Sequence, residues 1–305
     1  MPTILPQGPG RCVIIHSVFS YRHAFHAGNH ADVLKHVVLV ALLAHLRRKD
    51  TPFLVVDTHA GAGMYALNEG WAAQRAEFRD GVARLWGRCD APEAVAAWLA
   101  AVARHNPDGV LRNYPGSPML AFDALREQDR LRLFELHPAE HRVLEARFAR
   151  FDRAVARRVR IEKVDGFAGL KAVLPPLSRR ALVLVDPSYE DKRDYTRVVG
   201  ALREALSRFA TGCYAIWYPQ VQRREATALV RTLEHWPGLR SLNVTLSVSR
   251  PLPGGFGLYG SGVFVVNPPF GFEASMRASL PYLVDALALD RSARWWLHGQ
   301  ERPVK

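Results

Sequence analysis

Short apolar, β-branched runs alternate along the chain with longer segments whose apolar residues recur at helical spacing. The runs predict seven strands, at Phe53–Val56, Leu131–Glu135, Val159–Val164, Ala181–Val185, Cys213–Trp217, Leu242–Val248 and Val263–Val266. Because strands separated by helix-length segments form βαβ units, the pattern predicts an α/β fold built on a mainly parallel sheet. The last two strands lie only fourteen residues apart across a segment rich in glycine and proline, which predicts an antiparallel hairpin at the sheet edge.

Helical patterns fill most of the remaining chain. Asn29 precedes a segment with apolar residues at helical spacing, so it is a candidate N-cap for an amphipathic helix. The 67 residues between Gly63 and Leu131 are too many for one crossover helix, and they contain two further helical patterns. We therefore expect one domain over residues 18–305, with a small helical insertion at about residues 69–114.

Composition excludes several classes of protein. With 49% hydrophobic and 23% charged residues, the chain has enough apolar material for a core. Its longest apolar run, Val37–Ala44, has eight residues, whereas a membrane helix needs about twenty. Three widely spaced cysteines provide neither a disulfide framework nor a cysteine zinc site. Because the first residues also lack the features of a signal peptide, we expect a cytoplasmic protein.

The balance of charge points to a polyanionic partner. Lys and Arg number 41 and Asp and Glu number 29, which gives a net charge of +12. Nucleic acid is the first candidate for such a partner. The alternative is that the arginines only reflect a GC-rich coding sequence, and charge alone does not decide between the two.

A glycine-rich turn, Asp57-Thr-His-Ala-Gly61-Ala-Gly63, follows the first predicted strand. Glycine lets a cofactor approach the backbone closely. The spacing Gly61-x-Gly63-x-x-Ala66 also fits the dinucleotide fingerprint of an NAD-dependent dehydrogenase. Asp57 favours S-adenosylmethionine instead, because a carboxylate there can hold the cationic amino acid part of that cofactor and would repel a pyrophosphate. A turn that binds no ligand is the remaining alternative.

Acidic residues also end the next two strands. Glu135 can accept hydrogen bonds from both hydroxyls of a ribose. Asp165 and Gly166 follow the third strand, where a carboxylate and a backbone amide can bind the edge of an adenine. Taken alone, Asp165-Gly166 is also typical of a simple turn.

The segment Asp186-Pro187-Ser188-Tyr189 follows the fourth strand, where open α/β sheets place their sites. The lone pair of an adenine N6 amine is delocalised into the ring, so the amine is a poor nucleophile until acceptors bind its hydrogens. Asp186 and the Pro187 carbonyl can be those acceptors, and Tyr189 can stack on a base that has left its helix. The segment therefore predicts methylation of an exocyclic amine.

A second segment, Asn267-Pro-Pro-Phe270, also follows a strand, and it fits the amino-methylase pattern [DNS]PP[YFW] better than Asp186-Pro-Ser-Tyr189 does. Its position argues against it. In a doubly wound sheet the fourth strand lies beside the first, whereas the last strand belongs to the edge hairpin. We therefore expect Asp186, and not Asn267, to lie beside the cofactor.

The segment from Ser20 to His36 interleaves aromatic, basic and amide side chains ahead of the first helix. Such a mixture suits an RNA base and its phosphates. His26 and His30 have the i,i+4 spacing of metal ligands, but no second set of ligands completes a site. We therefore expect no metal. A helix lead-in with incidental histidines is the alternative.

Five segments together resemble a known family. They are Ser20-Tyr-Arg-His-Ala-Phe-His-Ala-Gly-Asn-His-Ala-Asp-Val-Leu-Lys-His36, Asp57-Thr-His-Ala-Gly-Ala-Gly63, Tyr114-Pro-Gly-Ser-Pro118, Glu135-Leu-His-Pro138 and Trp217-Tyr-Pro219. These segments are similar to the RlmJ family, the 23S ribosomal RNA adenine-N6 methyltransferases that act at RNA nucleotide 2030. The resemblance covers about residues 19–300, and its first segment is long and specific.

The resemblance implies a Rossmann-like class I methyltransferase fold with S-adenosylmethionine as the donor and 23S ribosomal RNA as the partner. It implies a cofactor pocket lined by Lys35, His36, His59, Ser117, Glu135, Asp165, Gly166 and Asp186. It also implies that Asp186 is catalytic and that Tyr21 and His23 lie near the target adenine. The family usually has Asp-Pro-Pro-Tyr, and Ser188 departs from it. Because the first proline supplies the accepting carbonyl, we expect activity to survive.

Other functions stay open at this point. Ser188 permits a non-catalytic RNA-binding ribosome-assembly factor, and the glycine spacing permits a dehydrogenase. A cytosine-C5 methylase needs a cysteine nucleophile, and no cysteine adjoins Asp186. We expect the enzyme to be a monomer that does not contact membranes.

Residues 1–17 contain three prolines and two glycines and show no sustained period, which predicts a disordered extension. Members of the family begin close to the Ser-Tyr-Arg-His segment. Position 18 is a valine. Valine can be encoded by GTG, which is also a common alternative start codon in bacteria. We therefore expect translation to start at Val18.

Overall fold

The structure is a computed structural model, and it describes residues 26–69, 75–251, 254 and 257–300. The expected disordered extension at residues 1–17 lies outside the described residues, as do Tyr21 and His23. Among the described residues, no helix is long and apolar enough to cross a membrane.

A central sheet of eight strands has the order β10-β8-β9-β7-β6-β1-β4-β5. The strands from β5 to β7 are parallel, and β9, β8 and β10 continue the sheet through antiparallel pairs. The predicted α/β fold with a mainly parallel sheet is confirmed. The strands are β1 (Leu54–Asp57), β4 (Arg130–Phe134), β5 (Val159–Glu162), β6 (Ala181–Val185), β7 (Cys213–Gln220), β8 (Ser241–Ser247), β9 (Gly260–Val266) and β10 (Arg294–Gln300).

Two details of the predicted sheet were wrong. The sheet has eight strands instead of seven, and the antiparallel hairpin of β8 and β9 is not at its edge, because β10 pairs with the outer side of β8. The sequence of β10, Arg-Trp-Trp-Leu-His-Gly-Gln, has no run of β-branched residues. None of its residues is fully buried, so the apolar signal that identified the other strands is missing.

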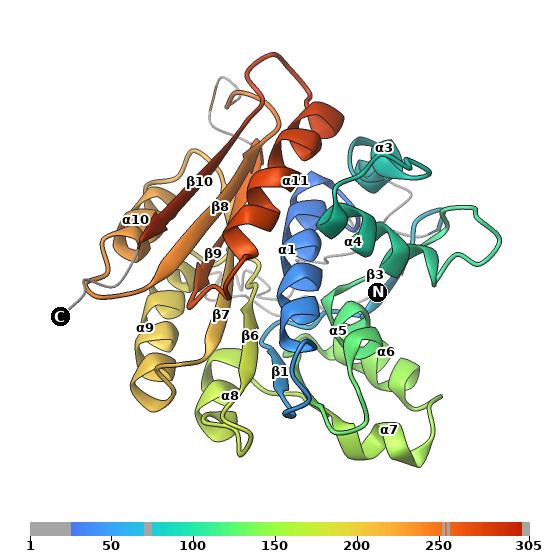
Figure 1. The fold of residues 1–305 in the computed structure, drawn as a ribbon, viewed down its shortest axis with the longest axis vertical. Coiled ribbons are helices and arrows are strands. Elements are labelled where there is room, and N and C mark those ends of the chain that lie inside the picture. Colours follow the sequence, from blue (N-terminus) through green and yellow to red (C-terminus); the bar gives the residue numbers. More distant parts are fainter. Residues whose placement is uncertain (1–25, 70–74, 252–253, 255–256, 301–305) are drawn as a thin grey trace, which may run out of the picture.

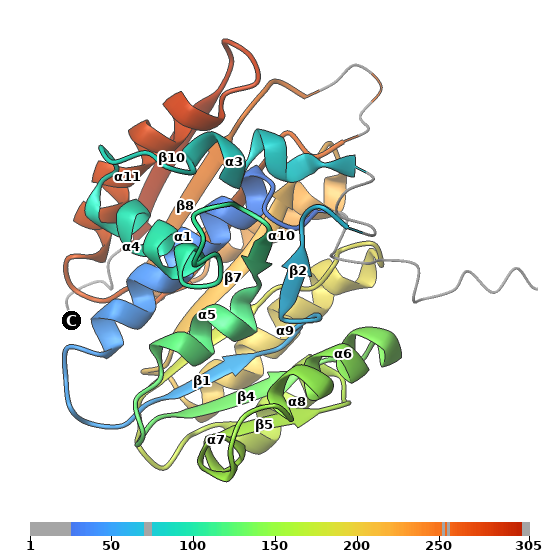
Figure 2. The same cartoon turned by 90° about the vertical axis from the view of Figure 1, so that its right-hand side faces the viewer.

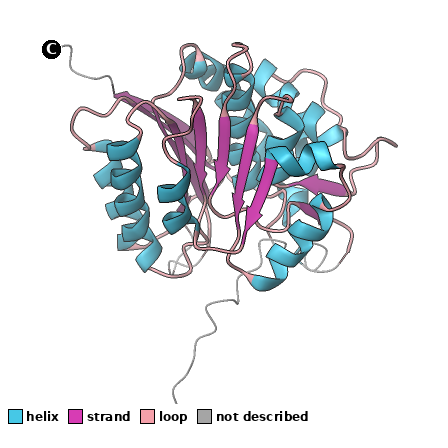
Figure 3. Ribbon diagram, turned by 90° about the horizontal axis from the view of Figure 1, so that it is seen from below, coloured by secondary structure: helices cyan, strands magenta, loops and turns pink. Residues whose placement is uncertain are grey.

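Helices cover both faces of the sheet (Figures 1 and 3). Two separate apolar clusters, one on each face, hold these layers together. On one face lie α1 (His30–Leu46), α4 (Glu93–Ala103), α5 (Ser117–Ala124), α6 (Pro138–Phe148), α7 (Arg153–Arg158) and α11 (Phe272–Leu287). On the other face lie α8 (Gly166–Val173), α9 (Arg193–Arg208) and α10 (Arg224–Glu234).

Helix α1 is the centre of the first layer. The Asn29 side chain accepts hydrogen bonds from the amides of Ala31 and Asp32, which confirms the predicted N-cap. The helix contacts β6, β7 and β9 on one side and α4, α5 and α11 on the other. It is therefore buried nearly all round, and its polar residues Asp32 and Lys35 are enclosed with the apolar ones.

A helical segment interrupts the path from β1 to β4. A small antiparallel pair, β2 (Met64–Ala66) and β3 (Asn113–Pro115), closes it at its base. Between them lie η2 (Glu77–Asp80), α3 (Val82–Leu85) and α4, and α4 packs on the outer side of α1 (Figure 2). Trp98 of α4 is fully buried within the apolar cluster of that face. These helices therefore extend the main core and do not form a core of their own.

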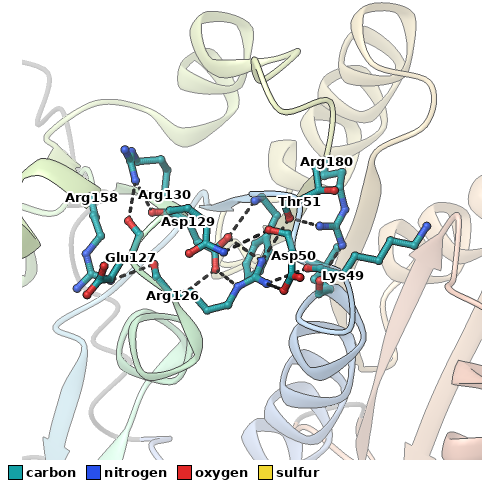
Figure 4. A network of polar contacts seen from close by, with 12 residues as sticks. Lys49, Asp50, Thr51, Arg126, Glu127, Asp129, Arg130, Arg158 and Arg180 are labelled. Atoms are coloured by element: carbon teal, nitrogen blue, oxygen red, sulfur yellow. Dashed lines mark hydrogen bonds and ion pairs between the residues drawn. The ribbon is translucent and has the colours of Figure 1, made fainter.

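A polar network fixes the amino-terminal edge of the sheet (Figure 4). The buried carboxylate of Asp129 accepts hydrogen bonds from the Phe53 amide at 3.1 Å and from the amide and Nε of Arg126, both at 2.9 Å. Arg126 also donates to the Lys49 carbonyl at 2.8 Å, and Arg180 donates to the Thr51 carbonyl. The network holds the starts of β1 and β4 together, and with them the positions of their carboxyl ends.

Candidate active site

Four carboxylates predicted from the sequence lie along the carboxyl edge of the parallel strands. Asp57 ends β1, Glu135 directly follows β4, Asp165 precedes α8 after β5, and Asp186 directly follows β6. The strands are neighbours in the order β5-β4-β1-β6. The sheet therefore brings together side chains that are far apart in the sequence, at its topological switch point.

The glycine-rich turn is joined to the end of β4. Gly61 and Gly63 have φ angles of 62° and 80°, in the left-handed region that favours glycine. The Gly61 amide donates to Glu135 at 2.7 Å, and the His137 amide donates to the other carboxylate oxygen at 2.6 Å. Burial raises the pKa of Glu135, and the two amides partly oppose this shift.

Asp57 is held in a buried position at the end of β1. Its carboxylate accepts hydrogen bonds from the Ser117 hydroxyl at 2.7 Å and from the His59 amide at 3.2 Å. Burial raises the pKa of Asp57 to about 6, with the Asp186 charge adding to the effect and the Ser117 hydrogen bond opposing it. Asp57 is therefore a carboxylate whose negative charge is costly until a cation joins it.

Two aromatic rings, those of His59 and Phe167, are in contact between the ends of β1 and β5. The His59 ring meets the Phe167 ring edge to face, with centroids 4.9 Å apart. Asp165 caps α8 by accepting from the Phe167 amide at 2.9 Å, and it pairs with Arg197. A Cβ at Gly166 would lie 1.9 Å from the Thr58 carbonyl oxygen, so only glycine fits. Burial lowers the pKa of His59 to about 4, so its ring is neutral at physiological pH.

Asp186 forms a buried ion pair with α1. The Lys35 ammonium lies 2.6 Å from Asp186 and 2.8 Å from Asp32. Burial favours the neutral amine, but the two carboxylates outweigh it and raise the pKa of Lys35. Lys35 also lies 5.9 Å from the centre of the ring of Trp217, a residue within β7. The lysine thus stays charged and holds the Asp186 carboxylate in place.

Tyr189 lies differently from the expectation. Only 2% of its surface is exposed, and its ring packs against Tyr195 with centroids 4.6 Å apart. Its φ angle is 54°, and its hydroxyl donates to the Trp217 carbonyl at 2.7 Å. Because Tyr195 and Trp217 already occupy its surroundings, the ring is not open to a target base in this structure.

The family resemblance implies that His36 lies in the cofactor pocket. The structure buries His36 completely, with Nδ1 2.7 Å from the Tyr114 hydroxyl, so it faces β3. Three contributors to the site had no role assigned from the sequence. Asp32 pairs with Lys35, Trp217 contacts Lys35 and Tyr189, and Arg223 donates to the Tyr189 carbonyl at 3.2 Å. Only Trp217 had a usable signal, because it lies on the strand next to β6.

The second amino-methylase segment lies at the end of the sheet where the parallel strands begin, and the four carboxylates lie at the end where those strands finish. β9 runs antiparallel to β7, so Asn267 lies next to the start of β7. Its side-chain amide donates to the carbonyls of Ala210 at 2.9 Å and Gly212 at 2.7 Å. Asn267 thus closes a turn, away from the four carboxylates.

The histidines near the start of α1 are not surrounded by the further ligands that a metal site needs, among the described residues. His26 lies 2.9 Å from Glu77 of the helical segment, and burial lowers the pKa of His30 to about 4. Within the described ranges, no group of three or more His, Cys, Asp or Glu side chains could hold a metal ion.

S-adenosylmethionine fits the edge of the sheet. Its cationic amino acid part matches the buried Asp57 carboxylate, its ribose matches Glu135, and its adenine matches the Asp165-Gly166 amide beside Phe167. A Cβ at Gly61 would lie 2.5 Å from the Tyr65 hydroxyl, so this turn presents bare backbone. A doubly wound sheet with this turn after β1 and Asp-Pro after β6 defines a Rossmann-like methyltransferase that uses S-adenosylmethionine.

Comparison with known proteins identifies the family. Residues 50–297 match the family described as "Ribosomal RNA large subunit methyltransferase D, RlmJ". The chain is 47% identical over 266 residues to "Ribosomal RNA large subunit methyltransferase J" of Escherichia coli (strain K12), covering 87% of this chain and 93% of that protein. The protein of the same name in Haemophilus influenzae is 42% identical over 279 residues, covering 91% and 97%.

A solved structure shares the fold. The crystal structure of protein LPL1258 from Legionella pneumophila superposes with a TM-score of 0.81 at 33% identity, covering 90% of this chain and 98% of that one. The chain belongs to the RlmJ family of ribosomal RNA large subunit methyltransferases.

Proposed function

We propose that the protein transfers a methyl group from S-adenosylmethionine to the exocyclic N6 amine of an adenine in 23S ribosomal RNA, at nucleotide 2030 by family resemblance. The proposal depends mainly on Asp186 and Pro187, which follow the end of β6. Lys35 holds the Asp186 carboxylate, and β1, which ends at Asp57, is the neighbouring strand. Relatives named ribosomal RNA large subunit methyltransferase J support an RNA substrate. Family membership favours neither a dehydrogenase nor a non-catalytic assembly factor.

The cofactor is held by residues at the ends of β1, β4 and β5 in this proposal. Asp57 binds the amino group, with Ser117 orienting the carboxylate through its 2.7 Å hydrogen bond. Glu135 accepts from the ribose hydroxyls, and Asp165, Gly166 and His59 border the adenine. When bound, S-adenosylmethionine supplies an electrophilic methyl group.

The residues after β6 activate the amine. A carboxylate has about four acceptor positions, so Asp186 can accept from N6–H while it keeps the 2.6 Å contact with Lys35. The Pro187 carbonyl accepts the second N6–H. These two acceptors draw the hydrogens out of the ring plane and localise the lone pair on nitrogen. As the nitrogen–carbon bond would form, the carbon–sulfur bond of the donor would break, and the surplus N6 proton would pass along the Asp186 hydrogen bond to solvent. Because Lys35 holds its proton, it positions Asp186 and does not act as a base.

Tyr189 supports this turn in the proposal. Its hydrogen bond to Trp217 and its packing on Tyr195 fix the backbone that follows Pro187 and Ser188. Tyr21 and His23 contact the target adenine, and they precede the α1 segment that carries Lys35. The enzyme acts in the cytoplasm as a monomer.

Methyl transfer in vitro tests the proposal. Purified full chain is incubated with protein-free 23S ribosomal RNA and S-adenosylmethionine carrying a labelled methyl group, and the RNA is digested to nucleosides for mass spectrometry. We expect N6-methyladenosine from the RNA and almost none from free adenosine, because base recognition depends on RNA shape. Absence of RNA methylation, or a methyl group on another atom, would overturn the proposal.

A further inference from the structure

A groove on the α10 side of the sheet runs away from the active site. Helix α10 covers β7 but leaves the adjoining face of β8 and β10 open, and a cavity of about 460 Å³ lies there. A second cavity of about 460 Å³ continues past Glu234 to His298 and Gln300. We call this continuous surface the β10 groove.

The walls of the β10 groove carry aromatic and cationic side chains. Trp296 of β10 is 65% exposed, and Tyr259 and Trp295 line the same cavity. Arg231 of α10 and Arg294 of β10 are exposed on opposite sides of it. Neither guanidinium pairs with a carboxylate of the residues that the structure describes. An exposed tryptophan that shares a cavity with two unpaired arginines is an arrangement that can stack bases and bind phosphates.

The floor of the groove is polar and rigid. Asn243 accepts from the Tyr218 hydroxyl at 2.8 Å and donates to Glu234 at 2.7 Å. Ser247 donates to the Gln220 side chain at 2.5 Å. These side chains satisfy one another, and Glu234, the acid of the floor, is tied to Asn243. The exposed charge that a ligand meets is therefore that of the two arginines.

One end of the groove is lined by residues of β7 that directly follow Trp217 in the chain. Tyr218, Pro219 and Gln220 line its inner end, and they follow Trp217, the residue that contacts Lys35 and Tyr189. β10 lies four strands from β6 in the sheet, which is about 19 Å at the usual strand spacing. About six stacked nucleotides span that distance.

We infer that the β10 groove binds a single-stranded stretch of the substrate RNA next to the target adenine, with a base stacked on Trp296 and phosphates on Arg231 and Arg294. The inference rests on the proposed function for the identity of the polyanion. It explains how an enzyme that takes one base out of its helix holds the flanking strand while the base is in the active site.

Binding of a fluorescein-labelled single-stranded RNA of about twelve nucleotides to the full chain tests the groove. Trp296→Ala is expected to weaken binding about tenfold. Arg231→Ala and Arg294→Ala are each expected to reduce the slope of log affinity against log salt by about 0.7. The matched controls are Phe270→Ala, an aromatic that is 89% exposed and lines neither cavity, and Arg157→Ala, an exposed arginine on α7. Both are expected to bind like the wild type.

Methylation kinetics separate this inference from the proposed function. With 23S ribosomal RNA, Trp296→Ala is expected to raise KM several-fold and leave kcat and the affinity for S-adenosylmethionine unchanged. Unchanged RNA affinity and KM in all three groove variants would overturn the inference. A change only in the oligomeric state of these variants would also overturn it, because it would mark the groove as a protein interface. If the wild type does not methylate adenine but the groove variants still weaken its RNA binding, only the proposed function is overturned.

Discussion

Lys35 shows how a single buried charge can organise the site. A lysine removed from water is costly unless carboxylates compensate it, and here Asp32 lies at 2.8 Å and Asp186 at 2.6 Å. Asp32 comes from the same helix, so it holds the ammonium even when Asp186 is engaged elsewhere. This arrangement lets Asp186 bind a substrate amine without leaving an unpaired cation in the interior.

Asp186 and Asn267 make a matched pair for mutation. We expect Asp186→Asn to lose nearly all methyl transfer and to stay folded with a loss of about 2 kcal/mol in unfolding free energy, because Lys35 loses one of its two buried carboxylates and keeps its pair with Asp32. Asn267→Ala is expected to keep a near wild-type rate but lose about 2 kcal/mol, since it removes two hydrogen bonds at a residue with φ of 52°. Kinetics and urea denaturation measure the two effects. Full activity in Asp186→Asn would refute its assignment.

Cofactor binding should depend on pH through Asp57. Its pKa of about 6 lies above the ordinary value, so lowering the pH through 6 protonates the group that binds the amino group of the cofactor. The affinity for S-adenosylmethionine is expected to be about tenfold lower at pH 5 than at pH 7. His59 adds no charge in that window, because its pKa is about 4.

Calorimetric titration between pH 5 and 8 measures this dependence. The control variant Asp57→Asn is expected to bind weakly with a flat profile. For folding the sign is opposite: the raised pKa means that the folded state binds more protons than the unfolded state between about pH 4 and 6, so the Asp57 contribution to stability falls as pH rises through that window. A wild-type affinity that does not change below pH 6 would contradict the role of Asp57.

At the scale of elements, strands with strong apolar runs could be predicted from the sequence. For α1 the helix could be predicted, but its burial on both sides could not. Its apolar spacing predicts the helix and its cap, but the spacing does not show that α4, α5 and α11 cover the other side. That covering depends on contacts between distant segments. It also turns Lys35 and His36 from surface residues into buried ones.

The site residues also differ in whether the sequence alone could predict them. The carboxylates at strand ends could be predicted because parallel strands bring their carboxyl ends together. The pairing of Asp32 with Lys35 and the inward turn of Tyr189 could not, since both depend on which side chains fill the space beside them. The edge strand β10 was missed for the lack of an apolar run.

The amino-terminal edge of the sheet should govern stability separately from chemistry. Asp129→Ala leaves the Phe53 amide and the Arg126 guanidinium without their buried acceptor. We expect it to lower the free energy of unfolding by about 3 kcal/mol, with the affinity of the folded protein for S-adenosylmethionine unchanged.

Urea denaturation followed by circular dichroism measures that loss. The control is Asp191→Ala, which breaks an exposed pair with Arg193 and should cost less than about 1 kcal/mol. Equal losses in the two variants would show that the network of Figure 4 does not hold the strand ends.

For the whole molecule, the net charge of +12 predicts binding that depends on salt. Each phosphate neutralised by Lys or Arg releases counterions. We expect the affinity for ribosomal RNA to fall at least about tenfold between about 50 and 200 mM salt. Fluorescence anisotropy across that range is the measurement. A flat curve would show that the arginines reflect only composition.

The central claim is that this chain methylates an adenine N6 in 23S ribosomal RNA through Asp186. The most direct measurement maps N6-methyladenine in ribosomal RNA from a strain that lacks the gene and carries either the wild-type gene or Asp186→Asn. The account predicts that one methylated adenine disappears on deletion, returns with the wild type and stays absent with the variant. An unchanged map on deletion, or full restoration by Asp186→Asn, would contradict it.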